Sequence, residues 1–215
     1  MSQVAVLGSG VVGQVLADGF LKHGHDVVRG SRDTGKLADW KAKAGARATT
    51  ATFADAVRGA GIVVLAVKGS AAEAAVRLAG PANLAGKVVI DATNPIADAP
   101  PVKGILPYFT SMNESLMERL QKLAPEARFV KAFSSVGNAQ MVNPDFGGVR
   151  PTMFIAGDDA ASKAAVVAIL GQFGWDAEDV GGVEGARAIE PLCILWCARG
   201  FLHNQWGHAF HLLTR

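Results

Sequence analysis

Short apolar runs alternate with amphipathic segments along most of the chain. The run at 61–67 is apolar without interruption, which is typical of a central parallel strand buried on both faces. The segments between the runs repeat apolar residues at the spacing of one helix face. The pattern predicts strands at 3–7, 25–30, 46–50, 61–67, 87–93 and 128–134, and helices at 11–23, 34–44, 53–60, 70–79 and 113–123.

Strands that alternate with helices form parallel sheets with right-handed crossovers. We therefore predict an α/β fold with a Rossmann-type doubly wound parallel sheet and a small helical C-terminal part. A further β/α unit at 152–173 and a short strand at 175–181 continue the pattern, and the chain from Ala186 onward reads as mostly helix, with candidate breaks at Pro191 and Gly200.

A boundary between the sheet domain and the C-terminal part fits the pattern near 145–150 or near 180–185. We place it after residue 183, so that residues 1–183 form the nucleotide-binding sheet domain and residues 184–215 form a helical segment. This segment is too short to fold independently. Its four large aromatic side chains predict burial against the core or a second subunit: Trp196, Phe201, Trp206 and Phe210.

Charge and composition exclude several classes of protein. The net charge is +2 and the basic residues are spread along the chain, so no nucleic-acid-binding tract stands out. No apolar run reaches the ~18 residues needed to span a bilayer, and the N-terminus lacks the features of a signal peptide. We predict a cytoplasmic protein that binds neither nucleic acid nor membrane. Cys193 and Cys197, four apart in a helical segment, predict two buried thiols rather than a disulfide.

The sequence GSGVVG follows the first predicted strand and opens the first predicted helix. In this context Gly8 permits a tight turn, Gly10 lets the backbone approach a diphosphate, and Gly13 lets helix and strand pack closely. A diphosphate would lie against free backbone N–H groups at the positive end of the helix dipole. We predict a dinucleotide-binding loop made of Gly8, Ser9, Gly10, Val11, Val12 and Gly13. A glycine-rich turn without a ligand is the alternative.

The end of the second predicted strand indicates which dinucleotide fits. An NAD-binding protein usually has a carboxylate there, which binds the ribose hydroxyls and repels a 2′-phosphate. This chain has Ser31, a hydroxyl donor, and Arg32, whose planar fork matches phosphate. Lys36 adds a positive charge one helical turn later, while Asp33 is better placed to cap the helix. These residues predict NADP(H) rather than NAD(H); a solvated basic patch is the alternative.

Three segments follow the predicted strands at 61–67, 87–93 and 128–134. In a doubly wound sheet the ligand lies beyond the carboxyl ends of the strands. The first segment is expected to line the ribose and diphosphate, and the other two to lie near the nicotinamide, although an Asn-Pro dipeptide is also a common turn. The candidate cofactor contacts are Ala66, Val67, Lys68 and Asn94, and the candidate positioning groups are Asn94, Pro95, Ser134, Ser135 and Val136.

Four stretches of the sequence resemble one family. They are GSGVVGQVLADGFLKHGHDVVRGSRD, VIDATNPI, VKAFSSVGNAQMVNP and HAFHLL. They resemble the NADPH-dependent coenzyme F420 reductases (F420:NADP oxidoreductases), a group related to the NADP-binding domain of the STEAP metalloreductases. The resemblance implies that Ser31, Arg32 and Lys36 hold the 2′-phosphate and that a hydride passes between the nicotinamide and a deazaflavin. It also implies a cytosolic homodimer joined through the C-terminal helices.

The chain departs from this family after the sixth predicted strand. Members that act on F420 tend to carry a histidine where this chain has Ser134, and often a proline where it has Gly137. The acceptor is therefore F420, a flavin or another small molecule. A non-catalytic NADP(H)-binding sensor or scaffold protein is the alternative function.

No Ser-His-Asp set, metal cluster or paired carboxylates appear in the sequence. Hydride transfer between two rings needs mainly positioning and exclusion of water, so we nominate no general acid or base. A reductase of imines or carbonyls would need a proton donor, for which Tyr108 is the candidate. His203, His208 and His211 predict packing or interface roles rather than a metal site, and Glu190 a capping or polar-network role.

Overall fold

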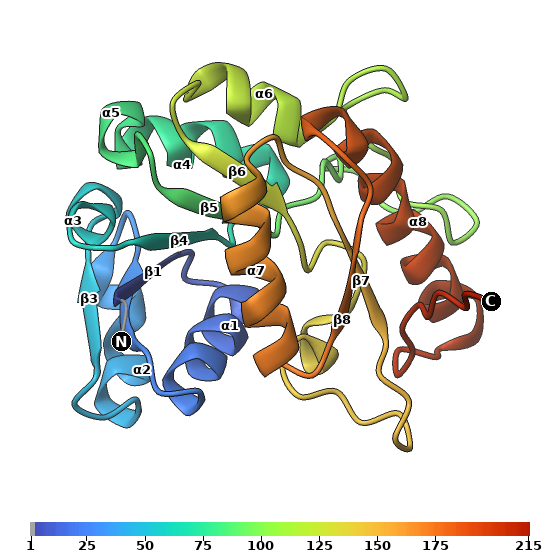
Figure 1. The fold of residues 1–215 in the computed structure, drawn as a ribbon, viewed down its shortest axis with the longest axis horizontal. Helices are drawn as coiled ribbons and strands as arrows, with labels where there is room; N and C mark the ends of the chain where they lie inside the picture. Colours follow the sequence, from blue (N-terminus) through green and yellow to red (C-terminus); the bar gives the residue numbers. More distant parts are fainter. Residues whose placement is uncertain (1–2) are drawn as a thin grey trace.

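The predicted apolar strands form a six-stranded parallel sheet in the computed structural model, which describes residues 3–215 (Figure 1). The strand order is β3-β2-β1-β4-β5-β6, so the chain winds outward in both directions from the middle of the sheet. This is the doubly wound order that the sequence predicts. The strands are β1 Gln3–Leu7, β2 Asp26–Gly30, β3 Ala48–Ala51, β4 Ile62–Leu65, β5 Val88–Asp91 and β6 Arg128–Lys131.

Helices cover both faces of the sheet (Figure 1). They are α1 Val11–Lys22, α2 Ala38–Lys43, α3 Phe53–Arg58, α4 Ala72–Ala79, α5 Pro81–Leu84, α6 Leu116–Leu123, α7 Ala160–Gln172 and α8 Ala186–His203. Successive strand residues point to opposite faces, so Val6 and Ile90 join the cluster under α1 and α7. Leu7 and Val89 join the cluster under α3, α4 and α6. The central strand β4 is apolar throughout because both of its faces are buried.

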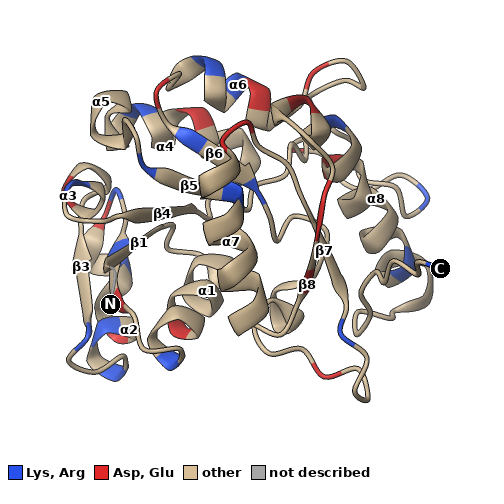
Figure 2. Ribbon diagram, viewed as in Figure 1, with Lys and Arg blue, Asp and Glu red and all other residues tan. Residues whose placement is uncertain are grey.

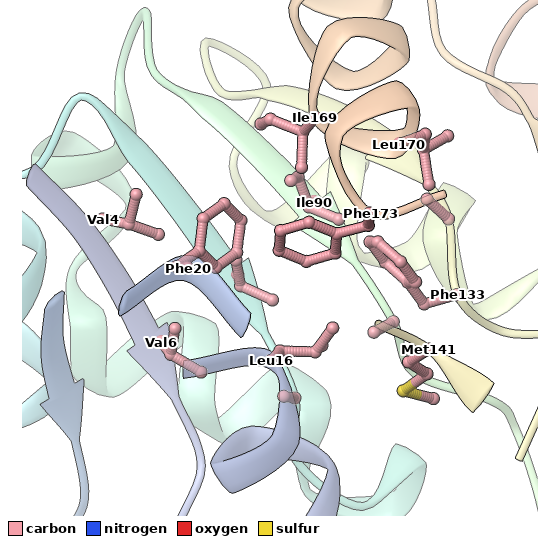
Figure 3. Close-up of a cluster of buried hydrophobic side chains, with 14 of the residues drawn as sticks. Val4, Val6, Leu16, Phe20, Ile90, Phe133, Met141, Ile169, Leu170 and Phe173 are labelled. Carbon is pink, nitrogen blue, oxygen red and sulfur yellow. The ribbon is translucent and has the colours of Figure 1, made fainter. Parts of the chain in front are cut away.

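Three phenylalanine rings lie together in the cluster under α1 and α7 (Figure 3). The ring centroid of Phe173 lies 5.0 Å from that of Phe20 on α1 and 6.0 Å from that of Phe133, which follows β6. Burial of such large apolar side chains is the main favourable contribution to folding. The backbone just beyond β6 is therefore fixed to the same core as α1 and α7.

The β/α unit predicted at 152–173 forms, but it begins a separate sheet. Strand β7 Thr152–Ile155 pairs in parallel with β8 Asp176–Asp179, and α7 makes the crossover between them. A single antiparallel bridge between Lys131 and Ala156 links this small sheet to the end of β6.

The prediction that the chain is mostly helical to its end is wrong beyond α8. The helix continues through both Pro191 and Gly200 and ends before Asn204, which adopts a left-handed φ of 52°. Trp206 then turns back onto the helix: a β-carbon at Gly200 would lie 2.2 Å from its ring. The aromatic tail thus packs on α8 instead of prolonging it. Among the helices of residues 3–215, none is long and apolar enough to cross a bilayer.

The tail also contacts the small sheet. The N–H of Thr152 donates to the carbonyl of Phe210 (2.8 Å), and the N–H of Leu212 donates to the hydroxyl of Thr152 (3.0 Å). Closer to the helix, the Trp196 indole N–H donates to the carbonyl of His208 (2.8 Å). These bonds satisfy backbone groups that a continuing helix would have paired internally.

The long segment between β5 and α6 is an ordered ribbon. The N–H of Ala97 donates to the carbonyl of Pro107 (2.8 Å), and the N–H of Phe109 donates to the carbonyl of Pro95 (3.0 Å). The helix that follows starts later than predicted, at Leu116, where Ser115 and Glu118 form a capping box.

Most charged residues are on helices and loops (Figure 2), and Lys131 at the end of β6 is an exception. Its fully buried ammonium group donates to Asp91 Oδ2 (2.7 Å), the carbonyl of Thr93 (2.8 Å) and Glu190 Oε1 (2.8 Å). Burial would by itself lower the pKa of this ammonium, but the charges of Asp91 and Glu190 outweigh that effect and raise the pKa. Lys131 is therefore held in its charged form.

Replacement of Lys131 by methionine is expected to lower the free energy of unfolding by about 3–5 kcal/mol, because it leaves two buried carboxylates without their counter-charge. Urea denaturation measures the difference. The control is Lys163→Met, which removes a pair with the exposed Asp179 carboxylate (2.8 Å) and should cost less than about 1 kcal/mol. Equal losses in the two variants would contradict the prediction.

Candidate functional site

The three glycines between β1 and α1 have different surroundings. Gly8 has a φ of +145°, and a β-carbon there would lie 2.2 Å from the carbonyl oxygen of Ala66. A β-carbon at Gly13 would lie 2.5 Å from the oxygen of Gly8, so this glycine allows the helix to approach the turn. At Gly10 nothing lies within 4 Å of such a carbon. There is therefore no room for a side chain at Gly8 or Gly13, which face the protein, whereas the space beside Gly10 is free for a ligand.

The N-terminus of α1 faces this opening. Ser9, Gly10 and Val11 are exposed and Val12 is half-buried. Gly10 occupies the N-cap position and provides no side-chain cap. The N–H groups of the first helical turn have no acceptor within the helix. Together with the helix dipole, they form a surface that attracts an anion such as a diphosphate.

Sequence reasoning missed Arg29 in this region. Its guanidinium group lies beneath the loop and donates through Nη2 to the carbonyls of Gly8 (3.0 Å) and Gly10 (3.3 Å). The residue is only 1% exposed. An arginine directly after the apolar pair Val27 and Val28 of β2 was the signal that could have identified it, because buried arginines almost always have a partner.

The end of β2 brings Ser31, Arg32 and Asp33 together. The buried Ser31 hydroxyl accepts the N–H of Asp33 (3.2 Å), which leaves its own proton available. Asp33 Oδ1 accepts the N–H of Gly35 (3.0 Å) and so caps the short 3₁₀ helix Thr34–Leu37, as predicted. The side chains of Arg32 and Lys36 are exposed and have no ion-pair partner within residues 3–215. Two unpaired cations thus flank a hydroxyl donor.

A cavity of about 260 Å³ lies between the glycine loop, the end of β2 and the segment after β4. Eight of the predicted cofactor residues line it: Gly8, Ser9, Gly10, Ser31, Arg32, Ala66, Val67 and Lys68. The remaining five do not: Val11, Val12, Gly13, Lys36 and Asn94. Four lining residues were missed, namely Phe53, Ala71, Ala74 and Ala75. The run of small residues after Gly69 was a usable signal, since it allows a flat group to approach the helix.

Asn94 and Ser134 join the segments that follow β5 and β6. The Asn94 amide N–H donates to the carbonyl of Ser134 (2.7 Å). Asn94 Oδ1 and Ser134 Oγ are buried and have no hydrogen-bond partner among the described residues. An unpartnered buried polar atom costs about 1–3 kcal/mol, so a polar ligand that bonded these atoms would be stabilised. Asn94 also abuts the segment after β4: a β-carbon at Gly69 would lie 1.8 Å from its carbonyl oxygen.

The residue before Ser134 has an unusual backbone conformation. Phe133 has a φ of 62°, which is rare for a bulky side chain. Its N–H donates to the Sδ atom of Met153 (3.1 Å), and its ring is buried in the core. Strain of this kind costs of order 1–3 kcal/mol and persists where the surrounding packing fixes it. Such strain is concentrated at functional sites.

The remaining predicted positioning groups, Pro95, Ser135 and Val136, are buried. Beyond them the chain passes under α8. A β-carbon at Gly137 would lie 2.4 Å from the ring of Trp196, so no larger residue fits at this position. Trp196 in turn stacks on His208 with 4.8 Å between the ring centroids.

Tyr108 is not a free proton donor. Its hydroxyl donates to the main-chain carbonyl of Glu190 (2.7 Å), and burial, with the nearby Cys193, raises its pKa. Glu190 is a network residue, as predicted: its carboxylate accepts the N–H groups of Leu116 (2.9 Å) and Met117 (3.1 Å) and caps α6.

The two cysteines are free thiols, with 3.9 Å between the Sγ atoms of buried Cys193 and half-buried Cys197. Two of the C-terminal histidines bond main-chain carbonyls: His208 Nε2 lies 3.1 Å from the oxygen of Trp196 and His211 Nδ1 lies 2.9 Å from that of Arg150. In the part of the chain that the structure describes, no three His, Cys, Asp or Glu side chains come together as a metal site.

Comparison with known proteins adds to this geometry. The family described as "NADP oxidoreductase coenzyme F420-dependent" matches residues 3–95, which include the glycine loop and Asn94. A crystal structure from Arthrobacter sp. FB24, provisionally assigned as an F420-dependent NADP reductase, is 31% identical, with 100% of both chains covered and a TM-score of 0.93.

Two more distant structures share the fold. The hypothetical protein SMa0349 from Sinorhizobium meliloti is 24% identical over 88% of this chain and 90% of its own, with a TM-score of 0.75. A reductive aminase from Aspergillus terreus, solved with NADPH4, cyclohexanone and allyl amine, is 21% identical; it covers 94% of this chain but only 63% of its own, with a TM-score of 0.68. No curated protein matches the chain.

Proposed function

Because this chain belongs to the coenzyme F420-dependent NADP oxidoreductase family, and is thus an NADP-dependent oxidoreductase, we propose that it transfers a hydride between NADPH and a deazaflavin of the F420 type. The observation that carries this proposal is the pair of unpartnered buried atoms, Asn94 Oδ1 and Ser134 Oγ, beyond the carboxyl ends of β5 and β6. A carboxamide-bearing ring such as nicotinamide offers both donors and an acceptor to such a pair.

The other half of the site fits the rest of NADP(H). The N–H groups at the start of α1 would bind the diphosphate, and the free cations Arg32 and Lys36, with the Ser31 hydroxyl, would bind the 2′-phosphate. Ala66, Val67 and Lys68 would line the ribose and diphosphate. When bound, NADPH supplies the hydride from its nicotinamide ring. The chain's own part is to bind, orient and exclude water.

The fixed protons around the site favour a ring acceptor over an imine or carbonyl. The Tyr108 hydroxyl donates a hydrogen bond to the Glu190 carbonyl. The Lys131 ammonium group donates to Asp91, Thr93 and Glu190. A deazaflavin or flavin takes the hydride without a proton donor held beside it.

Anaerobic NADPH oxidation tests the acceptor. We expect the purified protein to oxidise NADPH rapidly with F420, and much more slowly with FMN, FAD or riboflavin, when each is offered separately. NADH with the same acceptors is the control. Turnover with flavins alone would show that the acceptor is a flavin rather than a deazaflavin. Tight NADPH binding without turnover of any acceptor would favour the non-catalytic sensor.

Replacement of Arg32 by alanine should weaken NADPH binding by about 10- to 100-fold and leave NADH binding within about twofold, because a charge-assisted bond to phosphate contributes roughly 1.5–3 kcal/mol. Titration calorimetry with both nucleotides measures this. Arg58→Ala, which removes an exposed cation paired with Asp55, is the matched control and should change neither. Equal weakening of both nucleotides by Arg32→Ala would show that Arg32 does not read the 2′-phosphate.

The same proposal includes a homodimer formed through the C-terminal segment 184–215, beside the NADP-binding domain 1–183. Supporting it, large apolar side chains are exposed along α8 and on the neighbouring ribbon: Leu195, Phe201, Leu202, Val102 and Ile105. The two surfaces are continuous, since Gly104 of the ribbon lies against Leu202. Exposed apolar patches of this kind commonly mark interfaces.

Sedimentation equilibrium tests the dimer. The wild-type protein should sediment as twice the 22.3 kDa monomer, and Leu195→Asp should shift it toward the monomer by burying a charge in the interface. Leu78→Asp, at an equally exposed leucine of α4, is the control and should remain dimeric. A wild-type protein that sediments as a monomer would exclude the dimer.

A further inference from the structure

The Arg29 guanidinium donates to the carbonyls of two peptide groups in the glycine loop, and one of these, the carbonyl of Gly10, also accepts the N–H of Gln14 (3.0 Å). In a trans peptide the C=O and N–H bonds point in opposite directions, and the described chain has no cis peptide. Arg29 Nη2 holds the carbonyls of Gly8 (3.0 Å) and Gly10 (3.3 Å) toward the interior. The N–H groups of Ser9 and Val11, which share those peptides, are thereby turned outward to the place where a diphosphate would bind.

Arg29 is also a buried charge without an ion-pair partner. The residue is 1% exposed, its Nε has no hydrogen-bond partner, and no carboxylate of the described residues lies within ion-pair distance. Burial lowers the pKa of Arg29, and this effect outweighs that of the Asp18 carboxylate, which raises the pKa. A buried charge is costly unless it is paired. A diphosphate bound on the other side of the loop would add two negative charges near this cation.

The surroundings hold this side chain in place. Its guanidinium carbon lies 4.9 Å from the centre of the Trp40 ring, a cation–π contact. The indole N–H of Trp40 donates to Asp18 Oδ1 (2.7 Å) on α1, so Trp40 is itself fixed. Arg29 is thus clamped between α2 and the loop rather than free to swing into solvent.

We infer that Arg29 is a positioning residue of the dinucleotide site: it orients the loop N–H groups and places behind them the positive charge that balances the diphosphate. The inference rests on the proposed binding of NADP(H), and it adds a requirement that is independent of the 2′-phosphate. Because the diphosphate is common to NADP(H) and NAD(H), Arg29 should affect both equally, unlike Arg32.

Titration calorimetry with NADP⁺ and NAD⁺ tests this on the full chain. Arg29→Met should weaken both nucleotides by the same factor, about 10- to 100-fold, as expected for the loss of a charge-assisted contribution. Arg29→Lys keeps the charge but not the fork, and should recover most of that loss for both. Arg47→Met is the matched control: Arg47 also donates to a main-chain carbonyl, that of Leu21 (2.9 Å), but lies outside the loop, and its loss should leave both affinities unchanged.

The outcomes separate this inference from the proposed function. Failure of the wild-type protein to bind either nucleotide overturns both. Wild-type binding that a folded Arg29→Met variant retains within about twofold overturns the role of Arg29 alone. So does a loss confined to NADP⁺, or an equal loss in Arg47→Met. If circular dichroism shows that Arg29→Met does not fold, Arg29→Gln decides, since it removes the charge and keeps an amide N–H on a shorter polar side chain; unchanged affinity there overturns the inference.

Discussion

The ammonium group of Lys131 connects the elements on which the acceptor side of the site depends. Its three protons bind Asp91 at the end of β5, the main chain of Thr93 just before Asn94, and Glu190 on α8. Glu190 also accepts the first N–H groups of α6. A buried charge tolerates the loss of a partner poorly, so β5, β6, α6 and α8 keep one arrangement. The Asn94–Ser134 contact is built on this fixed base.

Much of the fold could be predicted because its determinants are local. Strands buried on both faces are mostly apolar, and helices packed on one side repeat apolar residues, so both leave a pattern in the sequence. The end of α8 leaves no such pattern. The helix ends before Asn204, which has a left-handed φ, and Trp206 packs on Gly200, a contact that helical periodicity cannot reveal. For the same reason the sequence did not show that β7 and β8 form their own sheet, since strand pairing depends on distant partners.

The candidate site likewise has parts that depend on local sequence and parts that depend on distant contacts. The glycine loop and the Ser31–Arg32 pair are short motifs whose roles follow from their place next to a strand, and the structure brings them together around one cavity. Asn94 and Ser134 were selected from the sequence, but their hydrogen bond joins residues 40 positions apart and was not foreseen. Arg29 was overlooked because its importance arises from burial under the loop, which depends on Trp40 and α1.

The two halves of the proposed site depend on different parts of the chain. The proposed cofactor half depends on main-chain N–H groups, on the exposed charges that follow β2 and on Arg29 beneath the loop. The proposed acceptor half includes two small residues, Ser134 and Gly137, and packing limits the space around them. The strained Phe133 turns the chain after β6, and Trp196 fills the volume next to Gly137. If the nicotinamide lies against Asn94 and Ser134, as we propose, a substitution at Ser134 would alter the room beside it without touching the diphosphate loop. On this proposal the choice of acceptor depends on the residues after β6 rather than on the glycine motif.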